Sequence, residues 1–276
     1  MEGETMSETS VISEQSILVD VKDTYHVITL NRPDKLNSFN DEMHRALYAA
    51  LETADADENC RAILLTAAGK GFCAGQDLGD RVKPTPDSPP PDLTQTIGDF
   101  YNPLIRKLKS INMPIVCAVN GVAAGAGANI AMACDIVIAS EKAKFIQAFA
   151  KIGLVPDSGG TYFLPRLVGS ARARGLAMLG TPITAAQAEE WGMIWKCSSA
   201  ETFLEEATAM VQELSVGPTI GLGLIKQALN ASEGNTLDEQ LDLERDYQGE
   251  AGRTPDYLEG VTAFMEKRAP KYSGKR

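Results

Sequence analysis

The chain of 276 residues is poor in histidine, the residue that most often binds metals or activates a serine nucleophile. It has two histidines, and neither the CxxC nor the HExxH spacing occurs, so we expect no metal site. A GxSxG segment is also missing. His26 falls in a predicted strand and His44 on an amphipathic helix, so both are interpreted as structural or surface residues. A serine hydrolase is therefore disfavoured.

Other absences limit where the protein works and what it binds. The five cysteines are odd in number and widely spaced, which indicates reduced thiols in a cytoplasmic protein rather than a disulfide framework. No apolar run approaches the roughly 18 residues that a membrane-spanning helix needs. The net charge of −11 argues against nucleic acid and anionic membranes as partners, and an anionic ligand would need local basic residues.

The pattern along the chain predicts a mixed α/β core followed by helices. Residues 1–15 are acidic and polar without a signal-peptide pattern, so we expect a disordered leader. Residues 16–199 alternate short β-rich runs with helices, which favours parallel pairing, and residues 82–92 form a Pro-rich stretch interpreted as a mobile surface loop. The strands are expected at 16–22, 25–31, 60–68, 114–121, 136–140, 144–148 and 193–197.

Capping signals and helical spacing mark the helices. Asn40 is a plausible N-cap, and Thr184 with Gln187 fits a capping box. In residues 200–276 only helical patterns occur. The helices are expected at 40–57, 93–110, 184–192, 200–215, 218–231, 236–251 and 255–267.

Three segments could carry chemistry, and each also has a structural interpretation. The turn FCAGQDL (72–78) could aim the backbone N–H of Gln76 at a ligand oxygen, or it is a plain strand-to-helix turn. Residues 120–135 place glycines before a small-residue helix, which suits an oxyanion site or close helix packing. They match neither the P-loop nor the dinucleotide fingerprint. In KIGLVPDSGG (151–160), Asp157 is a turn residue or N-cap, or an acid/base.

In their order, these segments resemble the crotonase (enoyl-CoA hydratase/isomerase) superfamily. NRPDKLNSFN (31–40) and FMEKRAPKY (264–272) extend the resemblance to roughly residues 16–272. It implies an α/β fold, a crotonase-like spiral of β-β-α repeats, with a C-terminal helical region at 200–276 that makes trimer contacts. The expected assembly is a homotrimer or a dimer of trimers.

The resemblance also implies roles for individual residues. The backbone N–H groups of Gln76 and Ala126 would hold the thioester oxygen as an oxyanion hole. Asp157 lies where isomerases of the family carry their single acidic group. The two glutamates of family hydratases fall on Asn129 and Phe149, neither of which transfers a proton, so classical hydration is disfavoured. Apolar neighbours of Asp157 are expected to raise its pKa.

The remaining implied contacts concern the CoA moiety of the substrate. Arg32 and Lys35 lie in the loop that contacts the CoA phosphates in this family. Lys267 adds positive charge near the C-terminus and would contact the CoA of its own subunit or of a neighbouring one. Adenine rests near Ala74 and Leu78 in this family. No metal or redox cofactor is implied, because CoA is part of the substrate.

The function implied is acyl-CoA isomerisation through a thioester enolate. Residues 152–180, 188–197, 218–230 and 235–268 resemble the family members that convert a ring epoxide of an arylacetyl-CoA to an oxepin. Those members are also implied to shift cis-3 to trans-2 double bonds. A general Δ3,Δ2-enoyl-CoA isomerase or hydratase-like enzyme of fatty-acid oxidation, a non-catalytic acyl-CoA-binding subunit and a peptidase on a related fold remain alternatives.

Overall fold

A computed structural model describes residues 15–79 and 92–275 of the chain. The predicted leader and the Pro-rich stretch lie outside these residues, apart from one residue at the end of each. The predicted hairpin at 16–31 and the helices capped by Asn40 and Thr184 are confirmed. No helix of the described residues is long and apolar enough to cross a membrane.

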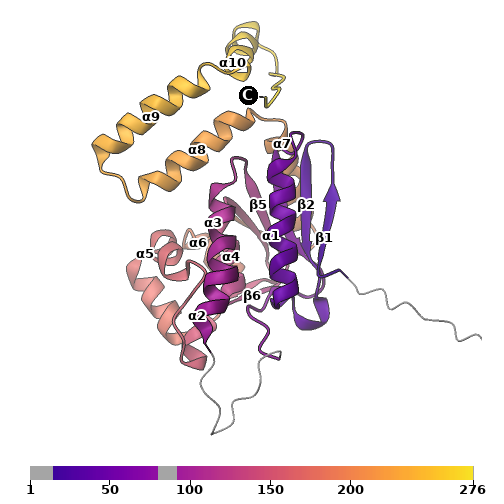
Figure 1. Ribbon diagram of the computed structural model, residues 1–276, viewed down its shortest axis with the longest axis vertical. Coiled ribbons are helices and arrows are strands. Elements are labelled where there is room, and N and C mark those ends of the chain that lie inside the picture. Colours follow the sequence, from indigo (N-terminus) through magenta and orange to yellow (C-terminus); the bar gives the residue numbers. More distant parts are fainter. Residues whose placement is uncertain (1–14, 80–91, 276) are drawn as a thin grey trace, which may run out of the picture.

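A six-stranded sheet forms the centre of the molecule (Figure 1). Its strand order is β1-β2-β3-β5-β7-β10. The β1 and β2 hairpin is antiparallel, and all other neighbours are parallel. The strands are β1 (Ile17–Val21), β2 (Tyr25–Leu30), β3 (Ala62–Ala67), β5 (Ile115–Val119), β7 (Ile136–Ser140) and β10 (Lys196–Ser198).

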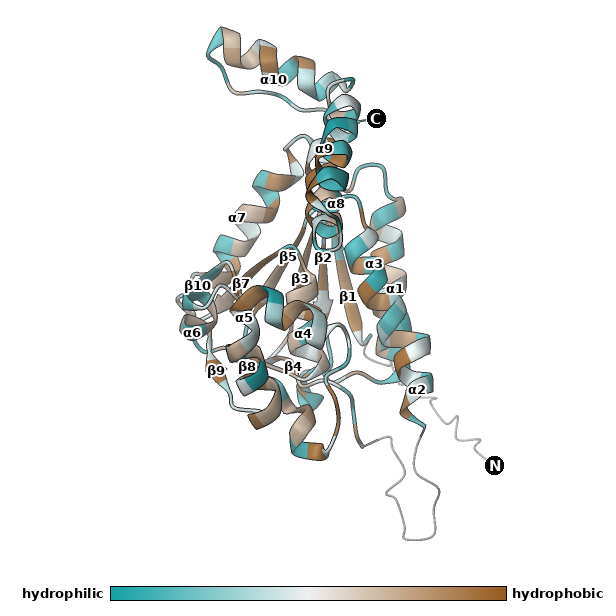
Figure 2. Ribbon diagram, turned by 90° about the vertical axis from the view of Figure 1, so that its left-hand side faces the viewer, coloured by the Kyte–Doolittle hydropathy of each residue, from teal (hydrophilic) through white to brown (hydrophobic). Residues whose placement is uncertain are grey.

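Both faces of this sheet are apolar, because helices cover each side. Ile63 and Leu65 of β3 join the large core beneath α1 (Asp41–Ala56), whereas Ala62 and Leu64 join a second core beneath α7 (Phe203–Ser215). This alternation follows the two-residue period of a strand. Figure 2 shows the hydrophobic strands between α7 on one side and α1 and α3 (Asn102–Ser110) on the other.

A smaller sheet follows the order β4-β6-β8-β9, with β4 at Gly71–Cys73, β6 at Val122–Ala124, β8 at Lys144–Ile146 and β9 at Ile183–Thr184. The strands β3, β5 and β7 lie in the large sheet, and their successors β4, β6 and β8 lie in the small one. A helical segment follows each of these pairs, so the predicted spiral of β-β-α repeats is confirmed. These helices are α2 (Leu93–Thr96) with α3, α4 (Ala126–Ala133) and α5 (Gly160–Leu179).

The last strand of the core, predicted at 193–197, begins three residues later than predicted, at Lys196. The backbone N–H groups of Met193 and Ile194 both donate to the carbonyl of Ala188 and close the end of α6 (Ala185–Glu190), so pairing begins only at Lys196. The predicted strand at 144–148 ends at Ile146, because a 3-10 helix follows at Ala148–Ile152. Local helix closure therefore takes priority over strand propensity at both places.

The C-terminal helices α8 (Thr219–Ser232), α9 (Leu237–Ala251) and α10 (Pro255–Glu266) project from one end of the core (Figure 1). Lys226 of α8 anchors them to the core. It is buried, lies 2.9 Å from Asp135 and donates to the carbonyl of Leu108. Gly223 allows close contact, because a Cβ there would overlap the carbonyl oxygen of Asn112.

Candidate active site

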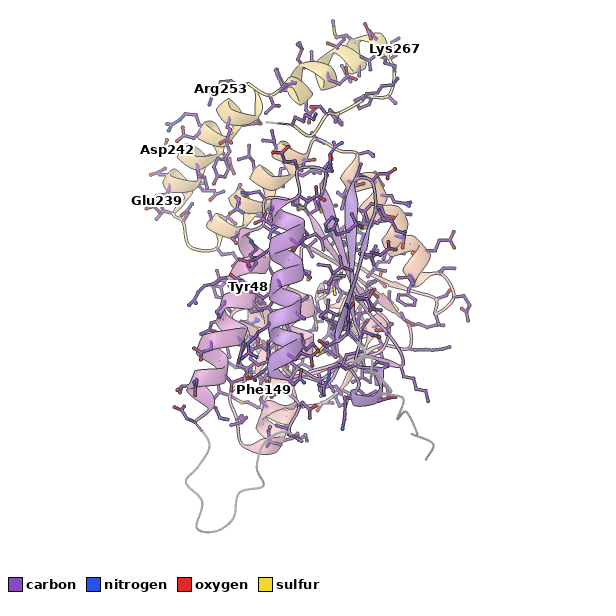
Figure 3. The ribbon with its side chains drawn as sticks, turned by 45° about the vertical axis from the view of Figure 1, so that its right-hand side comes forward. Tyr48, Phe149, Glu239, Asp242, Arg253 and Lys267 are labelled. Carbon is purple, nitrogen blue, oxygen red and sulfur yellow. The ribbon has the colours of Figure 1, made fainter. Side chains whose placement is uncertain are left out.

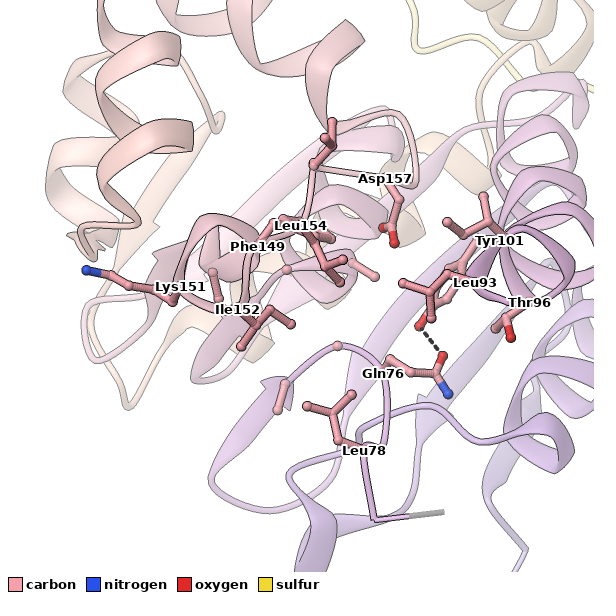
Figure 4. A pocket seen from close by; sticks show the side chains of 17 residues that line it. Gln76, Leu78, Leu93, Thr96, Tyr101, Phe149, Lys151, Ile152, Leu154 and Asp157 are labelled. Carbon is pink, nitrogen blue, oxygen red and sulfur yellow. Dashed lines mark hydrogen bonds between the residues drawn. The ribbon is translucent and has the colours of Figure 1, made fainter. Parts of the chain in front are cut away.

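A cavity of about 470 Å³ opens between the small sheet and the helical segment that starts at Leu93. Figure 4 shows its wall, which is largely apolar and carries one carboxylate among the residues described. The lining residues are Ala74, Gly75, Gln76, Leu78, Leu93, Thr96, Ile97, Tyr101, Gly125, Ala126, Ala148, Phe149, Lys151, Ile152, Leu154, Val155 and Asp157. The cavity thus brings together Gln76, Ala126 and Asp157, the three residues predicted to carry the chemistry.

The N–H of Gln76 is oriented by a short parallel bridge to Phe39. The N–H of Phe39 donates to the carbonyl of Gly75, and the N–H of Asp77 donates to the carbonyl of Phe39. In a parallel ladder the residue between two such bonds turns its own N–H to the opposite side. The N–H of Gln76 therefore faces away from Phe39, and Gln76 lines the cavity on that other side.

The N–H of Ala126 is placed by the glycine before it. Gly125 is the N-cap of α4 and has φ 54° and ψ −125°, a conformation that favours glycine. Its own N–H donates to the carbonyl of Ile146 and fixes the turn to β8. Ala126 is the first residue of α4, so its N–H belongs to the donors that a helix start leaves without an intrahelical acceptor. The helix dipole adds partial positive charge at this point.

Glycines bring the two donor segments together. A Cβ on Gly75 would lie 3.6 Å from the backbone nitrogen of Ala126, so the two chains pass closely there. A Cβ on Gly127 would overlap the carbonyl oxygen of Cys73 at the end of β4. The close-packing interpretation of these small residues is therefore confirmed, and the oxyanion site stays a prediction.

Asp157 enters the cavity from a tight turn before α5. Ser158 (φ 50°) and Gly159 (φ 77°) are both left-handed, and the N–H of Gly160 donates to the carbonyl of Asp157 at 2.8 Å, as in a type I′ turn. The Oγ of Ser158 donates to a carboxylate oxygen of Asp157 at 2.8 Å. The N-cap of α5 is Gly159, so the alternative that Asp157 caps this helix is wrong.

Asn129 has a structural task that sequence reasoning missed. Its Nδ2 donates to the carbonyl of Asp157 at 2.8 Å, and its Oδ1 accepts from Nε2 of Gln147 at 2.8 Å. Asn129 and Gln147 are both buried. A Cβ on Gly160 would overlap Nδ2 of Asn129, so the glycine makes room for this contact. The amide therefore holds the backbone of the turn that presents Asp157.

Tyr101 is a second residue that the sequence did not reveal. The predicted helix at 93–110 is confirmed, but a π-helical segment at Ile97–Tyr101 interrupts it between α2 and α3. The Tyr101 hydroxyl donates to Oε1 of Gln76 at 3.0 Å. π-Helical turns are frequent at functional sites. In the sequence, the adjacent aromatic residues Phe100 and Tyr101 are the one feature that sets this part of the helix apart.

The residues predicted to bind CoA lie in different settings. Ala74 and Leu78 line the cavity, and Lys35 is exposed. Arg32 is half-buried, lies 3.0 Å from Asp77 and donates to the carbonyl of Ser38 at 2.5 Å. Lys267 ends α10 and lies at the opposite end of the molecule from the cavity residue Phe149 (Figure 3). The structure therefore does not bring Lys267 to the cavity of its own chain.

The histidines and cysteines lie outside the cavity lining. His26 is buried and lies 2.9 Å from Asp57, while burial lowers the pKa of His44 to about 4, so the structural interpretation holds for both and the surface alternative is wrong. All five cysteines are free. No cluster of three or more metal-ligating side chains occurs among residues 15–79 and 92–275.

Comparisons with known proteins agree with this fold. The family described as enoyl-CoA hydratase/isomerase matches residues 20–275. The chain is 56% identical to 1,2-epoxyphenylacetyl-CoA isomerase of Escherichia coli K12, covering 94% of this chain and 98% of that protein. It is 35% identical to trans-2-decenoyl-acyl-carrier-protein isomerase of Streptococcus mutans, covering 95% and 99%. The crystal structure of an enoyl-CoA hydratase from Bacillus anthracis superimposes with a TM-score of 0.88 at 30% identity, covering 95% and 100%. The chain belongs to the enoyl-CoA hydratase/isomerase family.

Proposed function

We propose that this chain is an acyl-CoA isomerase that works through a thioester enolate, with Asp157 as its general acid and base. One observation carries the proposal. Asp157 is the only carboxylate among the described residues of the cavity wall, and it shares that wall with the backbone donors of Gln76 and Ala126. A single acid/base beside an oxyanion site suits a proton shift within one molecule.

The proposed reaction begins with the thioester oxygen accepting hydrogen bonds from the N–H groups of Gln76 and Ala126. Asp157 removes a proton from the carbon next to the carbonyl, and the two donors stabilise the negative charge that moves onto oxygen. One such donor contributes about 3–4 kcal/mol to the transition state. Asp157 then returns the proton to another carbon of the same molecule, so no metal or redox cofactor is needed.

The substrate we favour is 1,2-epoxyphenylacetyl-CoA, which rearranges to an oxepin. The bond between the two epoxide carbons breaks, the oxygen stays bonded to both, and the proton shift rearranges the double bonds, so no atom is gained or lost. The Escherichia coli relative at 56% identity is named for this substrate, which supports the choice. A cavity with walls of Leu78, Leu93, Ile97 and Phe149 also offers an apolar space for a ring. A linear 3-enoyl thioester is the second candidate, since the Streptococcus mutans relative is named as an isomerase of a linear trans-2-decenoyl group.

Hydration remains disfavoured, because Asn129 and Phe149 stand where family hydratases carry their two glutamates. The Asn129 amide already donates to the carbonyl of Asp157. The Phe149 ring lies 3.6 Å from the position that a Cβ would take on Gly125. Neither side chain transfers a proton to or from water. The peptidase alternative is weakened as well, because neither histidine lines the cavity.

Three further proposals concern the surroundings of the site. Exposed Lys35 meets the CoA phosphates, while Arg32 holds Asp77 beside the same loop. The C-terminal helices join copies of the chain into a trimer or a dimer of trimers, which would let Lys267 meet the CoA of a neighbouring subunit. Five free cysteines fit the reducing conditions of the cytoplasm.

Asp157→Asn tests the acid/base assignment. The variant keeps the shape of the side chain, so we expect normal folding and acyl-CoA binding with isomerisation at least about 10³-fold slower. Asp23→Asn, at an exposed turn outside the cavity, is the matched control and keeps full activity. Near-wild-type turnover by Asp157→Asn would refute the mechanism. A wild-type protein that binds acyl-CoA thioesters and isomerises none would instead support a non-catalytic subunit.

A further inference from the structure

Tyr101 is a polar group of the cavity that the proposed proton transfer does not use. Its side chain is almost fully buried, and its hydroxyl lies at the cavity wall 3.0 Å from Oε1 of Gln76. Figure 4 shows Tyr101 and Asp157 on adjoining parts of the wall, with the Tyr101 hydroxyl toward Gln76. A buried phenol at this place can contact the acyl group while Asp157 acts on it.

The Tyr101 ring is held rigidly from behind. The His44 ring meets it edge-on at a centroid distance of 4.4 Å, and the Phe39 ring lies at 6.2 Å. The π-helical segment that ends at Tyr101 contains one residue more per turn than an α-helix and so changes where the side chain points. A hydroxyl fixed in this way is a pre-organised hydrogen-bond donor.

The partner of Tyr101 can exchange its hydrogen-bonding role. A phenol both donates and accepts, and the amide of Gln76 carries an acceptor oxygen and a donor nitrogen. When the Gln76 amide rotates by half a turn, its nitrogen donates to the Tyr101 oxygen. The phenol proton is then directed at a ligand. The oxyanion donor of Gln76 is its backbone N–H, so this rotation leaves the thioester contact unchanged.

We propose that Tyr101 is a specificity-determining residue that donates a hydrogen bond to the ring oxygen of the acyl group. The proposal rests on the epoxide substrate proposed above. Isomerisation neither adds nor removes that oxygen, so it is an acceptor in both the epoxide and the oxepin. One donor can therefore hold the ring throughout the reaction.

The apolar wall explains why the ring oxygen needs such a donor. Entering a cavity lined by residues such as Leu93 and Leu154 strips water from the oxygen, and a buried polar group without a hydrogen-bond partner destabilises the complex. Tyr101 replaces the lost water contact. A linear enoyl chain has no oxygen at this position and leaves the bond between Tyr101 and Gln76 intact, so Tyr101 favours the oxygen-bearing ring.

The test is Tyr101→Phe in the full chain, assayed with 1,2-epoxyphenylacetyl-CoA and with a linear cis-3-enoyl-CoA. We expect kcat/KM for the epoxide to fall about tenfold and that for the linear substrate to change less than about twofold. Tyr48→Phe makes the same chemical change on α1, away from the cavity lining, and leaves both values unchanged.

Gln76→Leu separates specificity from packing, because it removes the side-chain partner of Tyr101 and keeps the backbone donor. If Tyr101 only holds Gln76 in place, Tyr101→Phe and Gln76→Leu lower kcat/KM equally for both substrates, which overturns this proposal alone. A wild-type enzyme that isomerises the linear substrate and leaves the epoxide unchanged overturns the proposed substrate, and Tyr101 loses this role with it.

Discussion

The core and the C-terminal helices use apolar residues in opposite ways. In the core, Ile63 and Leu65 are completely buried, whereas Phe264 and Met265 of α10 are 83% and 77% exposed. The helix α9 buries none of its residues. Large apolar side chains that gather on a surface mark an interaction site. The core therefore buries its apolar side chains within one chain, whereas the C-terminal helices expose theirs, and the trimer proposed above would cover them.

A buried lysine is one of the contacts that join these two regions, together with hydrogen bonds such as that from Arg61 to Thr219. Lys226 of α8 pairs with Asp135, which also accepts a hydrogen bond from the N–H of Ile115 at the start of β5. Burial lowers the pKa of Lys226, although the nearby Asp135 opposes that shift. The C-terminal helices α8 to α10, called the arm below, are thus attached in part through a charge that is costly to bury and depends on its partner. The substitutions proposed next each change one region only: the Lys226–Asp135 contact, the core, or the arm.

Lys226→Met is expected to have the largest effect on stability. It leaves the Asp135 side chain, which is 18% exposed, without its cation and frees the carbonyl of Leu108, so the free energy of unfolding should fall by about 3 kcal/mol. Urea unfolding measures this loss, and hydrogen exchange should show α8 opening first. Lys142→Met, at an exposed site, should change the free energy by less than about 0.5 kcal/mol.

A second substitution sharpens the interpretation of this loss. Asp135→Asn in the Lys226→Met background removes the unpaired charge and still accepts from the N–H of Ile115, so part of the stability should return. If the double variant is as unstable as Lys226→Met, the loss comes from packing of α8 rather than from the charge. Docking of the arm would then not depend on the ion pair.

Much of the core could be predicted because its determinants are local. The caps at Asn40 and Thr184, the alternation in β1 and β2, and the glycines around Gly125 each depend on a few neighbouring residues. The resemblance then added what local patterns cannot supply. It assigned Gln76, Ala126 and Asp157 to one site, and the structure brings all three to one cavity.

The unpredicted features depend on contacts between residues distant in sequence. Tyr101 bonds to Gln76, Asn129 holds the Asp157 turn, and Lys226 pairs with Asp135 about 90 residues before it. In the sequence, Lys226 resembles an ordinary surface lysine of an amphipathic helix, and nothing local distinguishes it.

Gly127→Ala alters the core and leaves the arm untouched. A Cβ there overlaps the carbonyl oxygen of Cys73, so the start of α4 must move away from β4, at a cost of about 2 kcal/mol. Activity should fall as well, because the N–H of the preceding Ala126 moves with the helix. Thermal unfolding and kcat/KM measure the two effects.

Gly175→Ala is the control for Gly127→Ala, since a Cβ on Gly175 meets no atom within 4 Å. It lies within α5, where alanine is the better helix former, so stability should stay equal or rise slightly. A Gly127→Ala protein with wild-type stability and activity would show that the two donor segments tolerate more space between them than the geometry implies.

Phe264→Asp has the smallest expected effect within one chain and acts on the arm. The side chain is 83% exposed, so the free energy of unfolding of a single chain should change by less than about 0.5 kcal/mol. In a trimer the new carboxylate would be buried against an apolar neighbour, which is costly. Light scattering should therefore show a lower mass for this variant.

Gln248→Asp adds the same charge at an exposed polar site of α9 and should keep the wild-type mass. If both variants keep the wild-type mass, the apolar surface at Phe264 does not join copies of the chain. The exposed apolar side chains of the arm would then have to be covered by a different partner.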